Sequence, residues 1–175
     1  TMTEIDNQLL FDEGLSAKGK SIIEQNMNLD LKAAYERSME LAKAHTPISV
    51  GVLKHLASLV MRRTGGEVNG FGGSFDSSRG DLRLVNVTAG AGGKTYMNYQ
   101  KVPQKLEEFC KEINERRKEL LESPDIYEQY KLSFYAHLKL VTIHPWVDGN
   151  GRMSRLIMNH LQYEFGLVPS KVVKD

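Results

Sequence analysis

Residues 142–155 read TIHPWVDGNGRMSR, and this stretch separates two segments with helical periodicity. Pro145 cannot continue the helix before it, so we expect His144 at or just beyond a helix end. The turn at residues 148–151 contains two glycines, which permit positive φ and close approach of the backbone. Apolar periodicity then resumes at Leu156. The pattern predicts a helix–loop–helix unit whose second helix begins near residue 150 or 151.

The start of that second helix is a candidate anion site. Its first amides lack partners within the helix and point outward from the positive end of the dipole. Arg152 and Arg155 are three positions apart, so both can project from one face of the first turn. Because guanidinium groups donate paired hydrogen bonds to phosphate oxygens, this face suits a polyphosphate.

Two further side chains complete the candidate site. His144 titrates near neutral pH and could take a proton from an attacking hydroxyl. Asp148 offers a hard carboxylate for a Mg²⁺ that bridges phosphates. Taken singly, the turn is ordinary and the arginines suit a solvated helix face. Together, in this order and spacing, they indicate phosphate chemistry.

The same residues resemble the Fic family signature, His-Pro-Phe-x-Asp/Glu-Gly-Asn-Gly-Arg-x-x-Arg, and only Trp146 departs from it by replacing Phe. Upstream, residues 80–87 are similar to the Gly-x-x-Arg segment that leads into the flap of that family. His137 also recurs in relatives, where helix packing explains it. The resemblance covers residues 48–168.

The resemblance implies a mostly α fold, a Fic-type helical core with a β-hairpin flap. It implies a nucleotidyltransferase that moves AMP from ATP onto a Ser, Thr or Tyr hydroxyl of a protein. His144 would be the general base, a role worth about 10²–10⁴-fold in rate, and Asp148 would hold Mg²⁺. The ATP-binding residues would be Gly149, Asn150, Gly151, Arg152 and Arg155.

The expected flap is residues 88–97, which in the family grips an extended target segment by main-chain pairing. The partner is therefore a protein that bears a hydroxyl group. The glycines of this segment also imitate a phosphate-binding P-loop. That interpretation fails because the first glycine of the pattern would fall at Thr88, and residues 96–99 read as strand rather than helix.

Residues 20–26 resemble the inhibitory helix of one Fic class, Ser/Thr-x-x-x-Glu-Gly/Asn, with Glu24 as its glutamate. Lys20 and Gln25 depart from that form. Two interpretations stay open. Either Glu24 pairs with Arg155 and blocks productive binding of the γ-phosphate, or it is the exposed glutamate of an amphipathic segment. We therefore divide the chain into an N-terminal segment, 1–28, and a core domain, 29–175.

Three other functions compete with AMP transfer. The first is a nucleotide-binding regulatory module with little activity. The second is a deAMPylating enzyme that removes AMP from a modified protein, for which Glu24 would be essential. The third is transfer of UMP or another phosphate-linked group, because the contacts to the base lie outside the signature.

Composition narrows the class of partner. The 175 residues hold 23 basic and 22 acidic side chains, which argues against a surface built for nucleic acid or an anionic membrane. No apolar run reaches the ~20 residues of a membrane span, and residues 1–6 lack the features of a signal peptide. Cys110 is the single cysteine, so we expect a reducing compartment, the cytoplasm. The oligomeric state stays open.

Periodicity predicts the elements of one domain. Helices are expected at 29–45, 48–63, 103–122, 126–143 and 151–165. The glycine-rich residues 64–73 are expected to form a loop. Residues 82–87 alternate in polarity and are expected to pair as a strand with residues 95–99.

Overall fold

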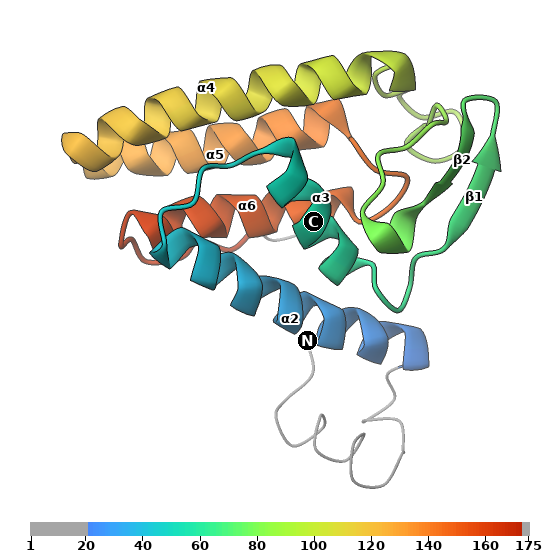
Figure 1. Cartoon of the computed structure of the whole chain (residues 1–175), viewed down its shortest axis with the longest axis horizontal. Helices are drawn as coiled ribbons and strands as arrows, with labels where there is room; N and C mark the ends of the chain where they lie inside the picture. Colours follow the sequence, from blue (N-terminus) through green and yellow to red (C-terminus); the bar gives the residue numbers. More distant parts are fainter. Residues whose placement is uncertain (1–20, 173–175) are drawn as a thin grey trace, which may run out of the picture.

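The computed structural model describes residues 21–172 and is mostly helical, which confirms the predicted fold class (Figure 1). Two short 3₁₀ turns, Ser77–Arg79 and Tyr99–Lys101, accompany the main elements. None of the helices in the described part is long and apolar enough to cross a membrane. The elements in chain order are α2 (Ile22–Lys43), α3 (Val50–Val60), β1 (Glu67–Gly70), β2 (Gly73–Asp76), α4 (Val102–Glu122), α5 (Ile126–Ile143) and α6 (Asn150–Glu164).

Local signals fix most helix starts. Side chains of Ser21, Ser49 and Asp125 accept hydrogen bonds from backbone amides at the starts of α2, α3 and α5. Pro103 lies in the first turn of α4, where its missing N–H costs nothing. The predictions for α4, α5 and α6 are therefore correct to within one residue at each end.

The start of α2 corrects the sequence analysis. The predicted helix began at residue 29, but α2 begins at Ile22 because Ser21 caps it. Glu24 and the packed core therefore share one continuous helix. The division at residue 28 falls inside α2 and stays a prediction, while residues 1–20 lie outside the described part of the chain.

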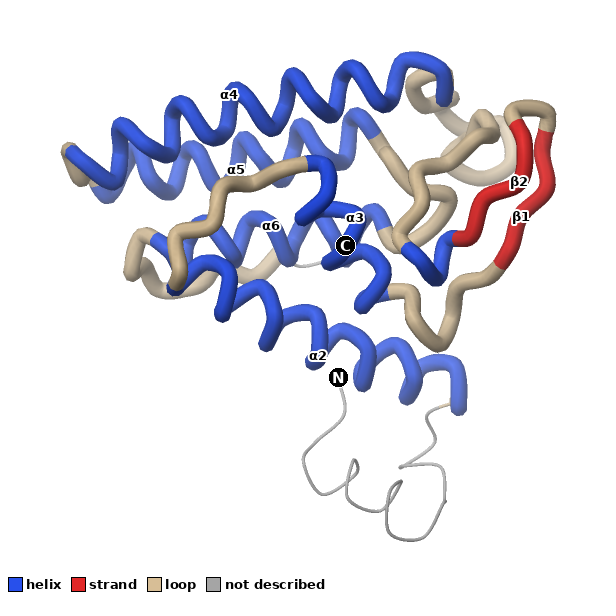
Figure 2. The backbone as a smooth tube through the Cα atoms, in the orientation of Figure 1, coloured by secondary structure: helices blue, strands red, loops and turns tan. Residues whose placement is uncertain are grey.

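The helices pack around one core (Figure 1). α4 lies beside α5, α5 beside α6, and α6 beside α2, while α3 packs chiefly on α2. The two-stranded hairpin projects at one end (Figure 2). The largest fully buried apolar side chains are Trp146, Phe109, Ile48, Leu53, Leu56, Leu106, Ile113, Leu132, Leu140, Ile143 and Met153.

The hairpin lies in a segment that the sequence analysis interpreted as a loop. β1 and β2 pair antiparallel, with Val68 opposite Phe75, around a turn at residues 71–72 (Figure 2). Phe75 is buried against the domain. Because glycines are typical of turns and loops, the composition of this segment did not indicate the two strands.

The predicted pairing of residues 82–87 with 95–99 is wrong as a pair of strands. The structure has one isolated antiparallel bridge there, between Thr88 and Thr95. Its neighbours extend it by two hydrogen bonds, Ala89 N to Lys94 O and Tyr96 N to Val87 O. A longer ladder does not form because the side chain of Arg83 binds carbonyls on both chain segments.

Candidate active site

His144 ends α5 in a left-handed conformation. Its φ is 51° and its ψ is 63°, and its amide still donates to Leu140 O at 2.9 Å. Pro145 disfavours the helical region for the residue before it. A left-handed histidine costs about 1–2 kcal/mol, so surrounding contacts must hold this backbone.

Arg83 supplies those contacts. Its side chain is 1% exposed, and its Nε donates to His144 O at 2.6 Å. The other guanidinium nitrogens donate to Val85 O at 2.9 Å, to Met97 O and to Ile143 O. One cation therefore joins the end of α5 to both chain segments that lead into the flap.

The loop after His144 is closed by Asn150. Its Oδ1 accepts from Trp146 N at 3.0 Å, and its Nδ2 donates to Trp146 O at 2.8 Å. The buried indole of Trp146 donates to Gly80 O at 3.1 Å. The side chain of Asn150 thus shapes the loop, which leaves its backbone amide as the group for the predicted phosphate contact.

The two glycines of the loop differ in the room that the structure leaves for a side chain. Gly149 precedes α6 with φ 81°, and a Cβ there would meet Met61 Sδ at 2.9 Å. A Cβ on Gly151 would meet a terminal nitrogen of Arg155 at 3.1 Å. The first turn of α6 is therefore a bare backbone surface beneath a guanidinium, a form that suits an anion.

The two arginines differ in their surroundings. One terminal nitrogen of Arg152 lies 3.7 Å from Asp148 Oδ1 and 3.5 Å from Met61 Sδ. Its other terminal nitrogen is buried and has no hydrogen-bond partner among the described residues. That donor is a ready contact for a phosphate oxygen. The side chain of Arg155 forms no hydrogen bond or ion pair with another described residue. Burial lowers the pKa of His137, and the charge of Arg155 lowers it further.

These groups line one cavity of about 370 Å³. The structure thus brings together every predicted site residue except Glu24. Met27 of α2 also lines the cavity, a placement that no sequence pattern indicated. The lining consists of Met27, His144, Val147, Asp148, Gly149, Asn150, Gly151, Arg152 and Arg155.

The surroundings of His144 suit a base. Burial of the ring lowers its pKa, and the charge of Arg83 lowers it further. The carbonyl of Val141 and the Asp148 carboxylate oppose this by favouring the charged form. Nδ1 is buried and has no hydrogen-bond partner within residues 21–172, so Nε2 is the nitrogen that can face the cavity.

Among the described residues, Asp148 is the one carboxylate that lines the cavity. Its side chain is 68% exposed, and Oδ1 accepts from Gly149 N at 2.7 Å. No cluster of three or more His, Cys, Asp or Glu side chains that could hold a metal occurs among the described residues. One carboxylate fits a Mg²⁺ that takes its remaining ligands from phosphate oxygens and water.

Glu24 lies on the exposed first turn of α2, one turn before Met27. Residues three apart share a helix face, so Glu24 is on the face that reaches the cavity. The ion pairs found among the described residues do not include one between Glu24 and Arg155. That pairing stays a prediction.

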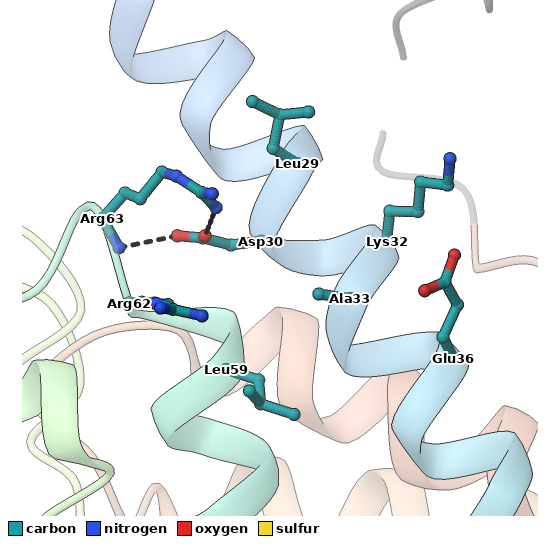
Figure 3. Close-up of a pocket in the computed structure, with 8 residues that line it drawn as sticks. All are labelled: Leu29, Asp30, Lys32, Ala33, Glu36, Leu59, Arg62 and Arg63. Carbon is teal, nitrogen blue, oxygen red and sulfur yellow. Dashed lines mark hydrogen bonds and ion pairs between the residues drawn. The ribbon is translucent and has the colours of Figure 1, made fainter.

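A second groove, of about 260 Å³, lies between α2 and α3 (Figure 3). Asp30 is buried at its edge, and its carboxylate accepts from the backbone amide of Arg63 at 2.8 Å and from the Arg63 guanidinium. This contact ties α2 to the segment after α3. It fixes the helix that carries Met27 and Glu24.

Sequence reasoning missed two contacts of the site. Arg83 was noted as part of the segment before the flap, but nothing in the sequence indicated that it binds His144. Tyr96 stacks on the His144 ring, with 3.7 Å between ring centroids and 11° between planes. The sequence carries no signal for this stack, because it depends on how the flap folds back.

The fold and site define a class. This is a helical domain in which the loop after His144 leads directly into the N-terminus of α6, and Arg152 and Arg155 of that helix line the same cavity as His144. The chain belongs to the Fic/DOC family, whose model matches residues 47–162.

Named relatives support that membership. The chain is 26% identical over 171 residues to protein adenylyltransferase fic-1 of Caenorhabditis elegans, a match that covers 97% of this chain and 30% of the relative. It is 30% identical over 183 residues to protein adenylyltransferase Fic of Drosophila melanogaster, covering 100% of this chain and 32% of the relative. The chain thus spans about a third of the length of these proteins.

Solved structures show the same fold. A Fic domain containing signaling protein from Bacteroides thetaiotaomicron matches with a TM-score of 0.70 and 18% identity. That match covers 95% of this chain and 58% of the other. Fic-1 from C. elegans matches with a TM-score of 0.61 and 24% identity over 97% of this chain and 45% of the other.

Proposed function

We propose that this protein is a protein adenylyltransferase that moves AMP from ATP onto a Ser, Thr or Tyr hydroxyl of a protein target. The observation that carries the proposal is the cavity in which His144, Arg152, Arg155 and the first turn of α6 meet. The names of the relatives support it, because both are protein adenylyltransferases.

In the proposed reaction, His144 Nε2 takes the proton of the target hydroxyl. The hydroxyl oxygen bonds to the α-phosphorus, and the bond from that phosphorus to the α–β bridging oxygen breaks. Pyrophosphate leaves. A base with a lowered pKa is neutral at pH 7, which is the form that accepts a proton.

The phosphates would lie on the first turn of α6. The backbone amides of Asn150 and Gly151 and the guanidinium groups of Arg152 and Arg155 would bind their oxygens. Gly149, whose amide donates to Asp148 Oδ1, would line the site with its bare backbone. The buried terminal nitrogen of Arg152 that lacks a protein partner supports this assignment. Fixed donors of this kind stabilise charge that develops on the leaving pyrophosphate.

Asp148 would hold Mg²⁺. When bound, the ion would neutralise phosphate charge and orient the leaving group. The exposed carboxylate, held by the Gly149 amide, fits this role.

The target segment would pair with the flap, residues 88–97. Residues 88–95 are all exposed, and their bridge at Thr88 and Thr95 leaves outward main-chain groups for an added strand. The proposal includes a cytoplasmic location, which rests on the single cysteine. It also includes a partner that is neither nucleic acid nor membrane, which rests on the balance of 23 basic and 22 acidic residues.

The test uses Mg²⁺ and ATP labelled on the α-phosphate, with and without host lysate. Wild type, His144→Ala and the control His55→Ala, an exposed histidine on α3, are compared. We expect labelled protein from wild type and His55→Ala, and at least a 100-fold loss in His144→Ala. ATP binding, measured by calorimetry, should survive in all three.

Three results would contradict the proposal. Label that persists in His144→Ala would remove His144 from the chemistry. ATP binding without label in any variant, including Glu24→Gly, would favour the regulatory module or the deAMPylating enzyme. Competition by UTP that exceeds competition by ATP would favour transfer of UMP.

A further inference from the structure

The hairpin of β1 and β2 carries a fully exposed aromatic side chain at its tip. Phe71 has a relative exposure of 108%, the highest value among the large apolar residues at the surface of the described part of the chain. It lies in the turn between β1 and β2, with glycine on both sides. A phenyl ring that stays entirely in water buries no apolar area, so the packing of the domain does not explain an aromatic residue at this place.

The base of the hairpin is fixed to the domain. Ser77 N donates to Gly66 O at 2.9 Å, and Gly66 N donates to Ser77 Oγ at 3.0 Å. Phe75 of β2 is buried, with a relative exposure of 5%. The hairpin therefore holds Phe71 at a defined place on the surface.

The turn of the hairpin lies against both chain segments that adjoin the flap, residues 88–97. A Cβ on Gly70 would overlap Cγ1 of Val85, which precedes the flap. A Cβ on Gly72 would lie 2.7 Å from the ring of Tyr99, which follows the flap. Glycine permits this close approach because it has no side chain. Phe71 thus stands between two residues that contact the two ends of the flap.

These contacts leave an apolar surface beside the flap. A Cβ on Gly73 would lie 3.7 Å from Leu84 Cδ1, so this leucine also adjoins the turn. Leu84, Val85 and Tyr99 are all half-buried, because the glycines above them have no side chains to cover them. Together with the exposed ring they form one uncharged surface, the tip patch, which consists of Phe71, Leu84, Val85 and Tyr99.

We propose that the tip patch binds a bulky apolar side chain of the protein acceptor, a few positions from the hydroxyl that receives AMP. This inference rests on the proposed function. Successive residues of an extended segment are about 3.3 Å apart. A segment that pairs along residues 88–97 therefore reaches the surface at either end of the flap within a few residues. There the Phe71 ring and an apolar side chain of the acceptor would leave water together.

The tip patch would supply a selection that the flap lacks. Main-chain pairing binds any extended segment, whereas contacts to individual side chains decide which segment is bound. None of the four residues of the patch carries a charge, so a polar or charged residue of the acceptor would lose its hydration there without a partner. The expected acceptor is a protein with a large apolar residue close to its modified Ser, Thr or Tyr.

The test compares Phe71→Ser with Phe71→Trp, which keeps a large aromatic ring. Host lysate is labelled with Mg²⁺ and ATP labelled on the α-phosphate. Ile126→Ser is the matched control, because Ile126 is 66% exposed and begins α5 at the opposite end of the domain from the hairpin (Figure 1). Each variant is made in wild type and in Glu24→Gly, and His144→Ala defines the background. Urea unfolding and titration with ATP should be the same in all surface variants, since Phe71 is exposed and lies outside the cavity.

In dilute lysate we expect Phe71→Ser to label the acceptor about tenfold more slowly, as for the loss of an aromatic anchor. Phe71→Trp and Ile126→Ser should label at the wild-type rate. The loss should shrink in concentrated lysate, because the patch affects binding of the acceptor and not the transfer step. If wild type labels protein and Phe71→Ser labels it equally fast, the inference is wrong and the proposed function stands. If no variant gives label that depends on His144, both are wrong.

Photo-crosslinking tests the contact without a rate. The photoreactive residue p-benzoylphenylalanine replaces Phe71 in one protein and Ile126 in another. After labelling and irradiation, the variant at position 71 should give a covalent product that contains the enzyme and the labelled acceptor. The variant at position 126 should not. Labelled acceptor that is crosslinked at neither position, or equally at both, would overturn the inference.

Discussion

The guanidinium of Arg83 donates to the main-chain carbonyl of His144 at 2.6 Å, and the amide of Arg83 donates to Pro145 O at 3.0 Å. Arg83 therefore binds the loop after α5 through both its side chain and its backbone. The same guanidinium also donates to Val85 O and Met97 O, so one side chain connects the flap with the proposed base.

This relationship predicts that Arg83 affects activity although it is not among the residues that line the cavity. Arg83→Met leaves several buried carbonyls unpaired and should lower the free energy of unfolding by about 2–4 kcal/mol, because each lost acceptor costs about 1–3 kcal/mol. Arg83→Lys keeps the positive charge but loses the planar guanidinium that donates to several carbonyls at once. Urea unfolding and hydrogen exchange of residues 88–97 measure the effect.

Arg83→Lys supplies the decisive comparison. It should stay folded, show faster exchange in the flap and lose at least tenfold in AMP transfer. A folded Arg83→Lys protein with wild-type exchange and transfer would show that the flap and His144 are independent.

Gly149 and Gly151 should respond differently to alanine. Gly149→Ala must accept φ 81° and a contact of 2.9 Å with Met61 Sδ, so we expect it to lose about 2 kcal/mol of stability. Gly151→Ala meets only the end of the Arg155 side chain, so stability should change by less than about 0.5 kcal/mol. Thermal unfolding checks both.

ATP affinity separates the two glycines further. Gly151→Ala should displace Arg155 and weaken ATP binding about fivefold to tenfold, as expected for loss of a charge-assisted hydrogen bond. Calorimetric titration with ATP and Mg²⁺ measures this. Unchanged affinity in Gly151→Ala would place the γ-phosphate away from Arg155.

The rate of AMP transfer should depend on pH through His144. The neutral imidazole is the active form, so the rate should rise as pH increases through the pKa and then level off. Burial and Arg83 lower that pKa, so the inflection should fall below the ordinary histidine value of about 6.5. Initial rates from pH 5 to 8.5 at saturating ATP give the profile. An inflection above that value would contradict the observed burial.

If Glu24 inhibits, its effect should depend on the position of α2. Glu24→Gly should raise transfer, and Asp30→Asn, which weakens the tie to Arg63, should raise it in the same direction. Glu40→Gln, an exposed residue farther along α2, is the control. Labelling with α-labelled ATP measures all three. If a folded Glu24→Gly protein has the wild-type rate, Glu24 does not inhibit, and the remaining interpretation is that it is the exposed glutamate of an amphipathic segment.

Stability should fall in acid because of His160. Burial lowers its pKa to about 4, with a smaller effect from Arg117 and an opposing one from Glu164. The unfolded chain binds a proton at higher pH than the folded one, so stability declines as pH falls from about 6.5 to about 4, by roughly 3 kcal/mol. Urea unfolding across this range should show a smaller decline in His160→Gln. If the free energy of unfolding falls equally with pH in wild type and His160→Gln, His160 is not the cause of the decline.

The sequence predicted the parts whose signals are local. Pro145 and the two glycines of residues 148–151 marked the loop, because backbone restrictions act within a few residues. Apolar periodicity gave α4, α5 and α6 nearly to the residue, since each helix buries one stripe. The order of His144, Asp148, Arg152 and Arg155 predicted the residues that the cavity brings together.

Contacts between distant segments could not be predicted in this way. Arg83 replaces a strand ladder with side-chain hydrogen bonds, so alternation at residues 82–87 suggested a strand that does not form. The hairpin at 67–76 arises among glycines because Phe75 is buried by the domain. Likewise, the stack of Tyr96 on His144 joins residues 48 positions apart.

The sequence by itself therefore determined the chemical groups and the helix–loop–helix that presents them, because short-range backbone preferences and apolar spacing specify both. Tertiary structure alone decided how the flap is tied to His144, which side chain stacks on the imidazole and that Met27 reaches the cavity of the candidate site. Those features depend on packing between segments far apart in the chain, and single-segment patterns carry no record of such contacts.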